Sequence, residues 1–220
     1  MINLHCHSLL SDGGLLPSEV AMRYLVRGYK VLAITDHTDY SNIDTIVPGI
    51  VSFCERWPGD FPIQVLPGVE LTHVPPEQFA PLTAYAREKG VRIVVAHGET
   101  VTEPVREGTN RAALKAGVDI LAHPGRITDD DVELARERGV FLEITSRRGH
   151  CATNQHVAAK AREHGARLIL NNDSHTPEDI ISPDELRAVG LDAGLTNPVI
   201  DEIWTGVRAY LSEKNMLDNQ

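Results

Sequence analysis

The architecture of this chain follows from a pattern in the stretch Lys89-Gly90-Val91-Arg92-Ile93-Val94-Val95-Ala96-His97. A glycine at the end of a helix commonly adopts a left-handed conformation that stops the helix. The short apolar, β-branched run after it is typical of a strand that is buried on both faces. The stretch therefore predicts a helix that ends at Gly90 and a buried strand that ends near His97.

The same junction of a glycine and an apolar run recurs along the chain. The other copies are Arg27-Gly28-Tyr29-Lys30-Val31-Leu32-Ala33-Ile34, Ala116-Gly117-Val118-Asp119-Ile120-Leu121, Arg138-Gly139-Val140-Phe141-Leu142 and His164-Gly165-Ala166-Arg167-Leu168-Ile169-Leu170. Two further apolar runs, over residues 2–5 and 63–69, bring the expected strands to about seven. Alternating strands and helices predict an α/β fold with a parallel sheet, closed or nearly closed into a TIM-barrel-like structure. An open doubly wound sheet has the same periodicity and stays an alternative.

The segments between these strands carry helix signals. Pro17 stands at the start of residues 17–27, whose apolar residues share one helical face. Thr128 with Asp131 resembles a capping box for residues 128–138, and Thr153 is placed to cap a helix to His164. We also expect a helix that opens at Glu77 and a closing helix over residues 198–211.

Bulk composition limits the class of protein. The 220 residues suit one domain, here expected to span 1–220, and the hydrophobic share of 42% is ordinary for a globular protein. No apolar run is long enough for a membrane helix, and the first residues do not resemble a signal peptide. The three cysteines are widely spaced and form no CxxC pair. We therefore expect a cytoplasmic protein without membrane partners.

The formal net charge is −10, from 31 acidic and 21 basic residues. An acidic surface repels a long polyanion, which argues against binding of duplex nucleic acid. Bound divalent cations would concentrate positive charge in one place. This combination favours a small anionic substrate.

Residues able to bind metals follow the predicted strands. His5 and His7 are two apart and so share one face of an extended segment. The carboxyl ends of the strands in an α/β barrel meet at one rim, and six histidines and three carboxylates fall there. They are His5, His7, Asp12, His37, Glu70, His97, His123, Asp173 and His175. Imidazoles with a few carboxylates are ligands for zinc, manganese or iron, and burying so many without a partner would be costly.

These residues stand in ordered motifs that resemble the PHP family, named for polymerase and histidinol phosphatase. The motifs are His5-Cys6-His7, Ser11-Asp12-Gly13, Thr35-Asp36-His37, Gly68-Val69-Glu70, His97, His123-Pro124 and Asp173-Ser174-His175. The resemblance covers residues 5–175. It implies a distorted (β/α)7 barrel and a metal-dependent phosphoesterase, a phosphatase similar to histidinol phosphatase.

The resemblance also implies a site for three cations, Zn, Mn or Fe. His5, His7, Glu70 and Asp173 would hold the first. Glu70 would bridge to a second with His97 and His123, and Asp12, His37 and His175 would hold the third. Some members of the family have histidine at the position of Asp12. The implied nucleophile is a hydroxide bound between two cations, with no side-chain nucleophile, acting on a small phosphate monoester.

Other polar residues near the rim are secondary candidates. We expect Arg126 and Arg147 to bind the substrate phosphate, since guanidinium pairs with phosphate bidentately, and Arg148 less so. Asp36 is interpreted as orienting an imidazole. Glu143 is interpreted as a structural hydrogen-bonding residue.

Three other functions are compatible with parts of this pattern. An amidohydrolase-type enzyme that cleaves a C–N bond also starts with HxH on a barrel strand, but Asp12 and His37 provide for a third metal. A noncatalytic module is disfavoured because all nine ligand positions are filled. A 3′–5′ exonuclease or phosphodiesterase stays an alternative.

Overall fold

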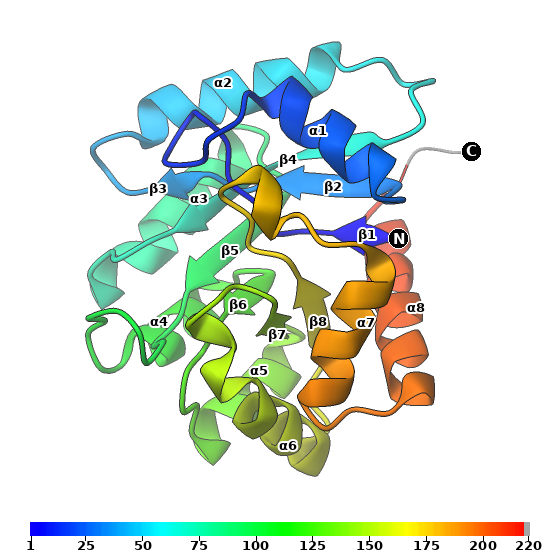
Figure 1. Cartoon of the computed structure of the whole chain (residues 1–220). Coiled ribbons are helices and arrows are strands. Elements are labelled where there is room, and N and C mark those ends of the chain that lie inside the picture. Colours follow the sequence, from blue (N-terminus) through cyan, green and yellow to red (C-terminus); the bar gives the residue numbers. More distant parts are fainter. Residues whose placement is uncertain (218–220) are drawn as a thin grey trace.

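A computed structural model describes residues 1–217, and its centre is a parallel β-sheet curled into a barrel (Figure 1). Neighbouring strands follow the order β1-β2-β4-β5-β6-β7-β8, and the short β3 pairs with β4. The strands are β1 (Ile2–Asn3), β2 (Val31–Ile34), β3 (His37–Thr38), β4 (Gln64–Leu71), β5 (Ile93–His97), β6 (Ile120–Ala122), β7 (Phe141–Thr145) and β8 (Leu168–Asn171). A doubly wound sheet would reverse its strand order part-way. This sequential order confirms the TIM-barrel-like prediction.

The seam between the first and last strands closes just beyond their carboxyl ends. Cys6 and Ser174 form an isolated parallel bridge, and the His7 amide donates to the Ser174 carbonyl at 2.9 Å. Between β1 and β8 themselves, the side chains of two asparagines accept hydrogen bonds from backbone amides, in place of the carbonyls of a neighbouring strand. Asn171 Oδ1 accepts from the Leu4 amide at 2.9 Å, and Asn3 Oδ1 accepts from the Asn172 amide at 2.8 Å. The seam therefore satisfies buried backbone donors that a regular ladder would otherwise pair.

Eight α-helices connect and surround the described strands (Figure 1). They are α1 (Pro17–Val26), α2 (Ile43–Arg56), α3 (Phe79–Glu88), α4 (Thr109–Ala116), α5 (Asp129–Arg138), α6 (Asn154–His164), α7 (Pro183–Asp192) and α8 (Asn197–Glu213). Short 3₁₀ turns cover Pro76–Gln78, His150–Thr153 and Pro177–Asp179. All five junction glycines have positive φ, between 68° and 97°, as the sequence pattern predicted.

The helix starts follow the sequence only in part. The Thr128 side chain accepts from the Asp131 amide, so the predicted cap of α5 is confirmed. Thr153 stands at the N-cap of α6 but its side chain makes no capping hydrogen bond, because a 3₁₀ turn leads into the helix. Glu77 likewise lies in a 3₁₀ turn, and α3 begins at Phe79.

Helix α8 packs against the amino-terminal end of the barrel. Its Val207, Tyr210 and Leu211 belong to the same buried cluster as barrel-lining residues such as Ile2 and Val31. The Tyr210 ring meets Phe141, at the start of β7, edge to face at 5.1 Å. This packing fills the amino-terminal end with apolar side chains and leaves the carboxyl ends for polar residues. Across residues 1–217, no helix combines the length and the apolar character that crossing a membrane requires.

Candidate metal centre

All nine predicted ligand residues meet at the carboxyl end of the barrel. His37, Glu70 and His97 lie on β3, β4 and β5, and His123 directly follows β6. The other five lie on the segments after β1 and β8: His5, His7, Asp12, Asp173 and His175. Residues up to 170 positions apart therefore share one site because parallel strands deliver their ends to the same rim.

Four of these residues form a first group. The Nε2 atoms of His5 and His7 lie 3.5 and 3.6 Å from Glu70 Oε2. The same nitrogens lie 3.5 and 3.2 Å from Asp173 Oδ1. Ligand atoms held at about 2.0–2.2 Å by one tetrahedral cation lie roughly 3.3–3.6 Å apart. These spacings suit a common cation.

The other oxygen of Glu70 faces a second group. Glu70 Oε1 lies 3.5 Å from His97 Nδ1 and 3.6 Å from His123 Nε2. His123 Nε2 also lies 3.6 Å from Asp173 Oδ2. Glu70 Oε2 also lies 3.2 Å from His37 Nε2. Because its two oxygens face different sets of imidazoles, Glu70 is placed to bridge two cations.

The third group lies nearer to solvent. His175 Nε2 is 3.4 Å from Asp12 Oδ2, and His37 Nε2 is 3.9 Å from Asp12 Oδ1. His7 joins this group through Nδ1, 4.0 Å from Asp12 Oδ1. The Asp12 side chain is 57% exposed, in contrast to the buried residues of the first two groups.

Eight buried polar atoms of the site have no hydrogen-bond partner among residues 1–217. These atoms are His5 Nε2, both ring nitrogens of His7 and His97, His123 Nδ1 and both carboxylate oxygens of Glu70. Buried polar groups are nearly always hydrogen-bonded, and leaving one unpaired costs about 1–3 kcal/mol. The donor set is the one that binds zinc or similar cations. The residues present therefore fit a cluster of divalent cations.

Glu143 forms hydrogen bonds with two of the predicted ligand residues. Its Oε1 lies 2.8 Å from His5 Nδ1 and accepts from Asn171 Nδ2 at 2.9 Å. Its Oε2 accepts from the His123 backbone amide at 3.1 Å. The predicted hydrogen-bonding role is confirmed, and the bond to His5 fixes which nitrogen of that ring faces Glu70.

Asp36 does not orient an imidazole, and that interpretation was wrong. Its carboxylate accepts from the Ser8 amide and hydroxyl, both at 2.8 Å, and from the Ser11 hydroxyl at 2.7 Å. These bonds fold residues 8–11 into the turn that carries Asp12 toward the site. The interpretation rested on the position of Asp36 next to His37 in the sequence. Its side chain instead points to the loop over residues 8–11.

The two candidate phosphate-binding arginines differ in setting. Arg147 is partly buried, and its Nη1 donates to Asp179 Oδ2 at 2.8 Å. Asp179 also accepts from the His175 and Thr176 amides, so Arg147 is tied to the loop that carries a predicted ligand. Arg126 is exposed beyond His123.

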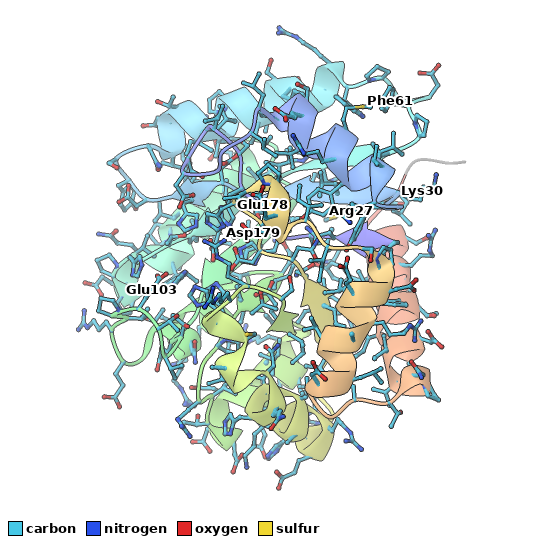
Figure 2. The ribbon with its side chains drawn as sticks, in the orientation of Figure 1. Arg27, Lys30, Phe61, Glu103, Glu178 and Asp179 are labelled. Atoms are coloured by element: carbon cyan, nitrogen blue, oxygen red, sulfur yellow. The ribbon has the colours of Figure 1, made fainter. Side chains whose placement is uncertain are left out.

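Three residues near the site were not predicted as part of it. The His150 ring stacks on His123 with centroids 4.3 Å apart, and the His73 ring lies 4.6 Å from that of His97. Glu103, labelled in Figure 2, reaches both His73 and His97 from the loop after β5. His73 and His150 each follow a strand end, a signal that could have found them. Glu103 lies in a loop without periodicity, so the sequence held no signal for it.

The protonation states of these side chains reflect their crowding. Burial and the neighbouring imidazoles hold the pKa of His7 and of His123 well below the usual histidine value, so both rings are neutral. Burial raises the pKa of Glu70, but the facing imidazoles more than offset it and hold that pKa well below its usual value. Burial raises the pKa of Asp173 to about 7.

Two of the ligand residues adopt left-handed backbone conformations. The φ angles are 28° at His123 and 50° at Asp173. Such angles are uncommon in residues other than glycine, although histidine and aspartate tolerate them better than most. Strain of this kind gathers at functional sites, where it aims side chains that a regular strand end would direct elsewhere.

Sequence comparison places the chain among known proteins. No protein-family model matches it. An uncharacterized protein from Methanocaldococcus jannaschii is 44% identical over 204 residues, covering 90% of this chain and 92% of that protein. The DNA polymerase/3′-5′ exonuclease PolX from Bacillus subtilis is 25% identical over 98% of this chain, which spans 40% of PolX. A probable phosphatase from Caldanaerobacter subterraneus is 26% identical over 97% of this chain and 92% of its own length.

This chain belongs to the PHP family. Its relation to a probable phosphatase supports a metal-dependent phosphoesterase, and the nine residues described above stand in the motifs on which the resemblance to the family was based. The PHP assignment therefore agrees with a donor set that fits divalent cations.

Solved structures agree with this PHP fold. HisK from Listeria monocytogenes, a candidate histidinol phosphatase, superposes with a TM-score of 0.60 at 10% identity, over 82% of this chain and 97% of HisK. An enamidase of the amidohydrolase superfamily gives a TM-score of 0.53 at 18% identity, over 80% of this chain and 58% of that chain. At such identities the likeness concerns the barrel and not the reaction.

Proposed function

We propose that this protein hydrolyses small phosphate monoesters at a centre of three divalent cations. His5, His7, Glu70 and Asp173 hold the first cation, Glu70 with His97 and His123 the second, and Asp12, His37 and His175 the third. The observation that supports this most is the group of buried nitrogens and carboxylate oxygens without hydrogen-bond partners among residues 1–217. Cations clustered in this way activate water and neutralise charge on a phosphoryl group.

The remaining side chains have supporting roles in this proposal. Glu143 orients His5, and Asp36 holds the turn that carries Asp12. The hydroxyls and the thiol that adjoin the ligands are already engaged: Ser8 donates to Asp36, Cys6 to the Ala33 carbonyl, and Ser174 shares a hydrogen bond with Tyr24. The proposal therefore needs no side-chain nucleophile.

Arg147 and Arg126 bind the phosphate of the substrate in this proposal. A guanidinium supplies two parallel donors to phosphate oxygens. We expect Arg147→Ala to raise KM for a phosphomonoester about tenfold or more, since a hydrogen bond to a charged group is worth roughly 1.5–3 kcal/mol. Steady-state kinetics test this, with Arg148→Ala, at the exposed neighbouring position, as the control. Equal KM values for the two variants would remove Arg147 from the phosphate site.

The direct test is a phosphomonoester panel assayed with Mn²⁺, Zn²⁺ or Fe²⁺ on purified protein. We expect turnover that a chelator abolishes and that Asp173→Asn or His97→Ala lowers by orders of magnitude. Asparagine tolerates the left-handed backbone at residue 173, so the fold should survive. The matched control is His156→Ala, because His156 bonds to the Ile127 carbonyl and is not one of the nine ligands. Activity retained in both ligand variants would contradict the proposal.

A second candidate activity is exonucleolytic cleavage of a phosphodiester. The relation to PolX over nearly the whole of this chain favours it, although this chain spans 40% of PolX. Short single-stranded oligonucleotides assayed beside phosphomonoesters separate the two activities. Amide and lactone substrates in the same panel test C–N or C–O bond hydrolysis by an amidohydrolase-type reaction.

A further inference from the structure

A second set of ligand-type side chains surrounds the outer face of His97. Glu103 Oε2 lies 3.0 Å from His73 Nε2 and 3.3 Å from His97 Nε2. Glu103 Oε1 lies 3.4 Å from His150 Nε2. None of the added residues, His73, Glu103 and His150, belongs to the nine ligands of the proposed centre. One carboxylate thus gathers three imidazoles beside that centre.

The His97 ring faces both sets of residues. Its Nδ1 lies 3.5 Å from Glu70 Oε1, on the inner side, and its Nε2 faces Glu103 on the outer side. The residue is only 2% exposed, and neither nitrogen has a hydrogen-bond partner among residues 1–217. At 3.3 Å the contact to Glu103 Oε2 is an ionic one, and it leaves Nε2 without a well-aligned hydrogen bond. A ligand on the outer side would satisfy it.

The fold holds these side chains in place from three separate loops. His73 follows β4 with a left-handed φ of 54°. The Nδ1 of His150 lies 2.7 Å from the Thr100 hydroxyl and 3.1 Å from the Thr102 hydroxyl, which fixes the ring in front of Glu103. Glu103 itself is on the loop after β5 (Figure 2). A left-handed histidine and a bonded ring are signs of a prearranged site.

We propose that His73, His97 and Glu103 bind a further divalent cation beside the nine-residue centre. Their ligand atoms all lie within 4.8 Å of one another. Two imidazoles and one carboxylate suit zinc, manganese or iron and leave coordination positions open for water or an anionic group. The His73 and Glu103 side chains are 45% and 39% exposed. His97 is shared with the inner centre, and because one ring binds two cations only as imidazolate, it releases its remaining ring proton to solvent when both cations are bound. The outer cation therefore binds more weakly and exchanges faster than the inner ones.

The test counts bound Zn²⁺ in the full chain by elemental analysis after equilibration at rising free Zn²⁺. The variants are His73→Asn, which keeps a residue that tolerates the left-handed backbone, and Glu103→Gln, which keeps the size of the side chain but removes its charge. We expect the wild-type protein to bind one equivalent more than either variant at saturation. The control His156→Ala should bind as many equivalents as the wild type. Circular dichroism and thermal melting check that all four proteins are folded.

Equal Zn²⁺ counts in the wild type and both variants would overturn the outer site. That result would leave the phosphatase proposal standing, because the inner ligands are unchanged. Conversely, a lost equivalent in the variants together with no hydrolysis by the wild type would support the outer site and contradict the proposed activity. Anomalous scattering at the zinc edge gives a second readout, with a peak expected between His73, His97 and Glu103.

Discussion

Glu143 is fully buried and connects four parts of the barrel. From β7 it bonds to His5 after β1, to the His123 amide after β6 and to Asn171 on β8. A carboxylate behind a metal-binding imidazole fixes the ring orientation and raises its basicity. At the scale of single residues, the site therefore depends on a residue that is not itself one of the nine proposed ligands.

We predict that Glu143→Gln lowers the metal affinity of the protein by roughly 10–100-fold, the usual effect of losing such a partner. Glutamine keeps the size and one acceptor oxygen, so the fold should persist. The metal concentration needed for half-maximal activity measures the effect, and excess Mn²⁺ should restore turnover. An unchanged metal requirement would show that His5 does not need the negative charge.

The sequence motifs predicted which nine side chains meet at the carboxyl end of the barrel but not the residues around them. The nine ligand positions stand in ordered motifs at strand ends, so barrel geometry and the motifs together suggest their meeting. Glu103 gave no such signal, because its position depends on how a loop without periodicity folds over β5. Asp36 was misread for a similar reason: adjacency to His37 says nothing about which loop its side chain meets.

At the scale of elements, the loop after β6 packs closely against the loop after β5, and this close packing requires a glycine. Gly125 follows His123 and has a φ of 64°. A Cβ atom there would lie 1.8 Å from the Glu99 carbonyl oxygen, so only glycine lets the two loops approach. Gly139, at the end of α5, has a similar φ of 68° but open space around it.

These two glycines give a matched pair of variants. We expect Gly139→Ala to cost about 1–2 kcal/mol, the usual cost of a left-handed non-glycine residue. Gly125→Ala should cost clearly more, because the backbone clash adds to the same strain, and it should also displace His123. Urea denaturation measures both. Equal losses of stability in the two variants would show that the backbone near residue 99 moves away readily to make room for a Cβ atom at position 125.

The order of elements was largely predictable, and the exceptions have local causes. The five glycine junctions mark helix ends and strand starts directly. Helix α2 was not predicted, since it contains Pro48 and its N-cap residue Asn42 makes no side-chain capping bond. The two-residue β3 is too short to show periodicity, and it exists because His37 and Thr38 pair with β4.

At the scale of the whole molecule, the metal-free site opposes folding in a pH-dependent way. Burial raises the pKa of Asp173 from 3.8 to about 7. Burial lowers the pKa of His97, but the carboxylates of Glu103 and Glu70 outweigh it and raise that pKa from 6.5 to about 9. Both groups bind protons more tightly in the folded chain. Their contribution to stability is complete at pH values below the pKa values that the groups have in the unfolded chain. It is lost as pH rises through the pKa values that they have in the folded chain.

We therefore predict that the protein in EDTA loses stability between about pH 4 and 9 through these two groups, with the His97 part between 6.5 and 9. Asp12 and Glu103 act oppositely, since their pKa values are lowered to about 2, and their contribution is lost as pH falls from about 4. His7 and His123 also act oppositely, because their lowered pKa values mean that below about 6.5 the unfolded chain binds protons that the folded chain does not. The EDTA form should therefore be most stable near neutral pH. Urea midpoints measure this.

Saturating Zn²⁺ should remove the loss at high pH, because cations bind deprotonated ligands and stabilise the folded state increasingly as pH rises. Identical pH profiles with EDTA and with Zn²⁺ would mean that these side chains do not bind the cation.

Anomalous X-ray scattering from crystals of the Mn²⁺- or Zn²⁺-loaded protein tests the central claim most directly. The account predicts three strong peaks at the carboxyl end of the barrel, one within each of the three groups of the nine-residue centre, apart from the weaker peak expected between His73, His97 and Glu103. Glu70 should lie at ligand distance, about 2.0–2.2 Å for zinc, from two of them. Crystals with bound metal elsewhere, and with Glu70, His97 and Asp173 contacting no peak, would contradict it.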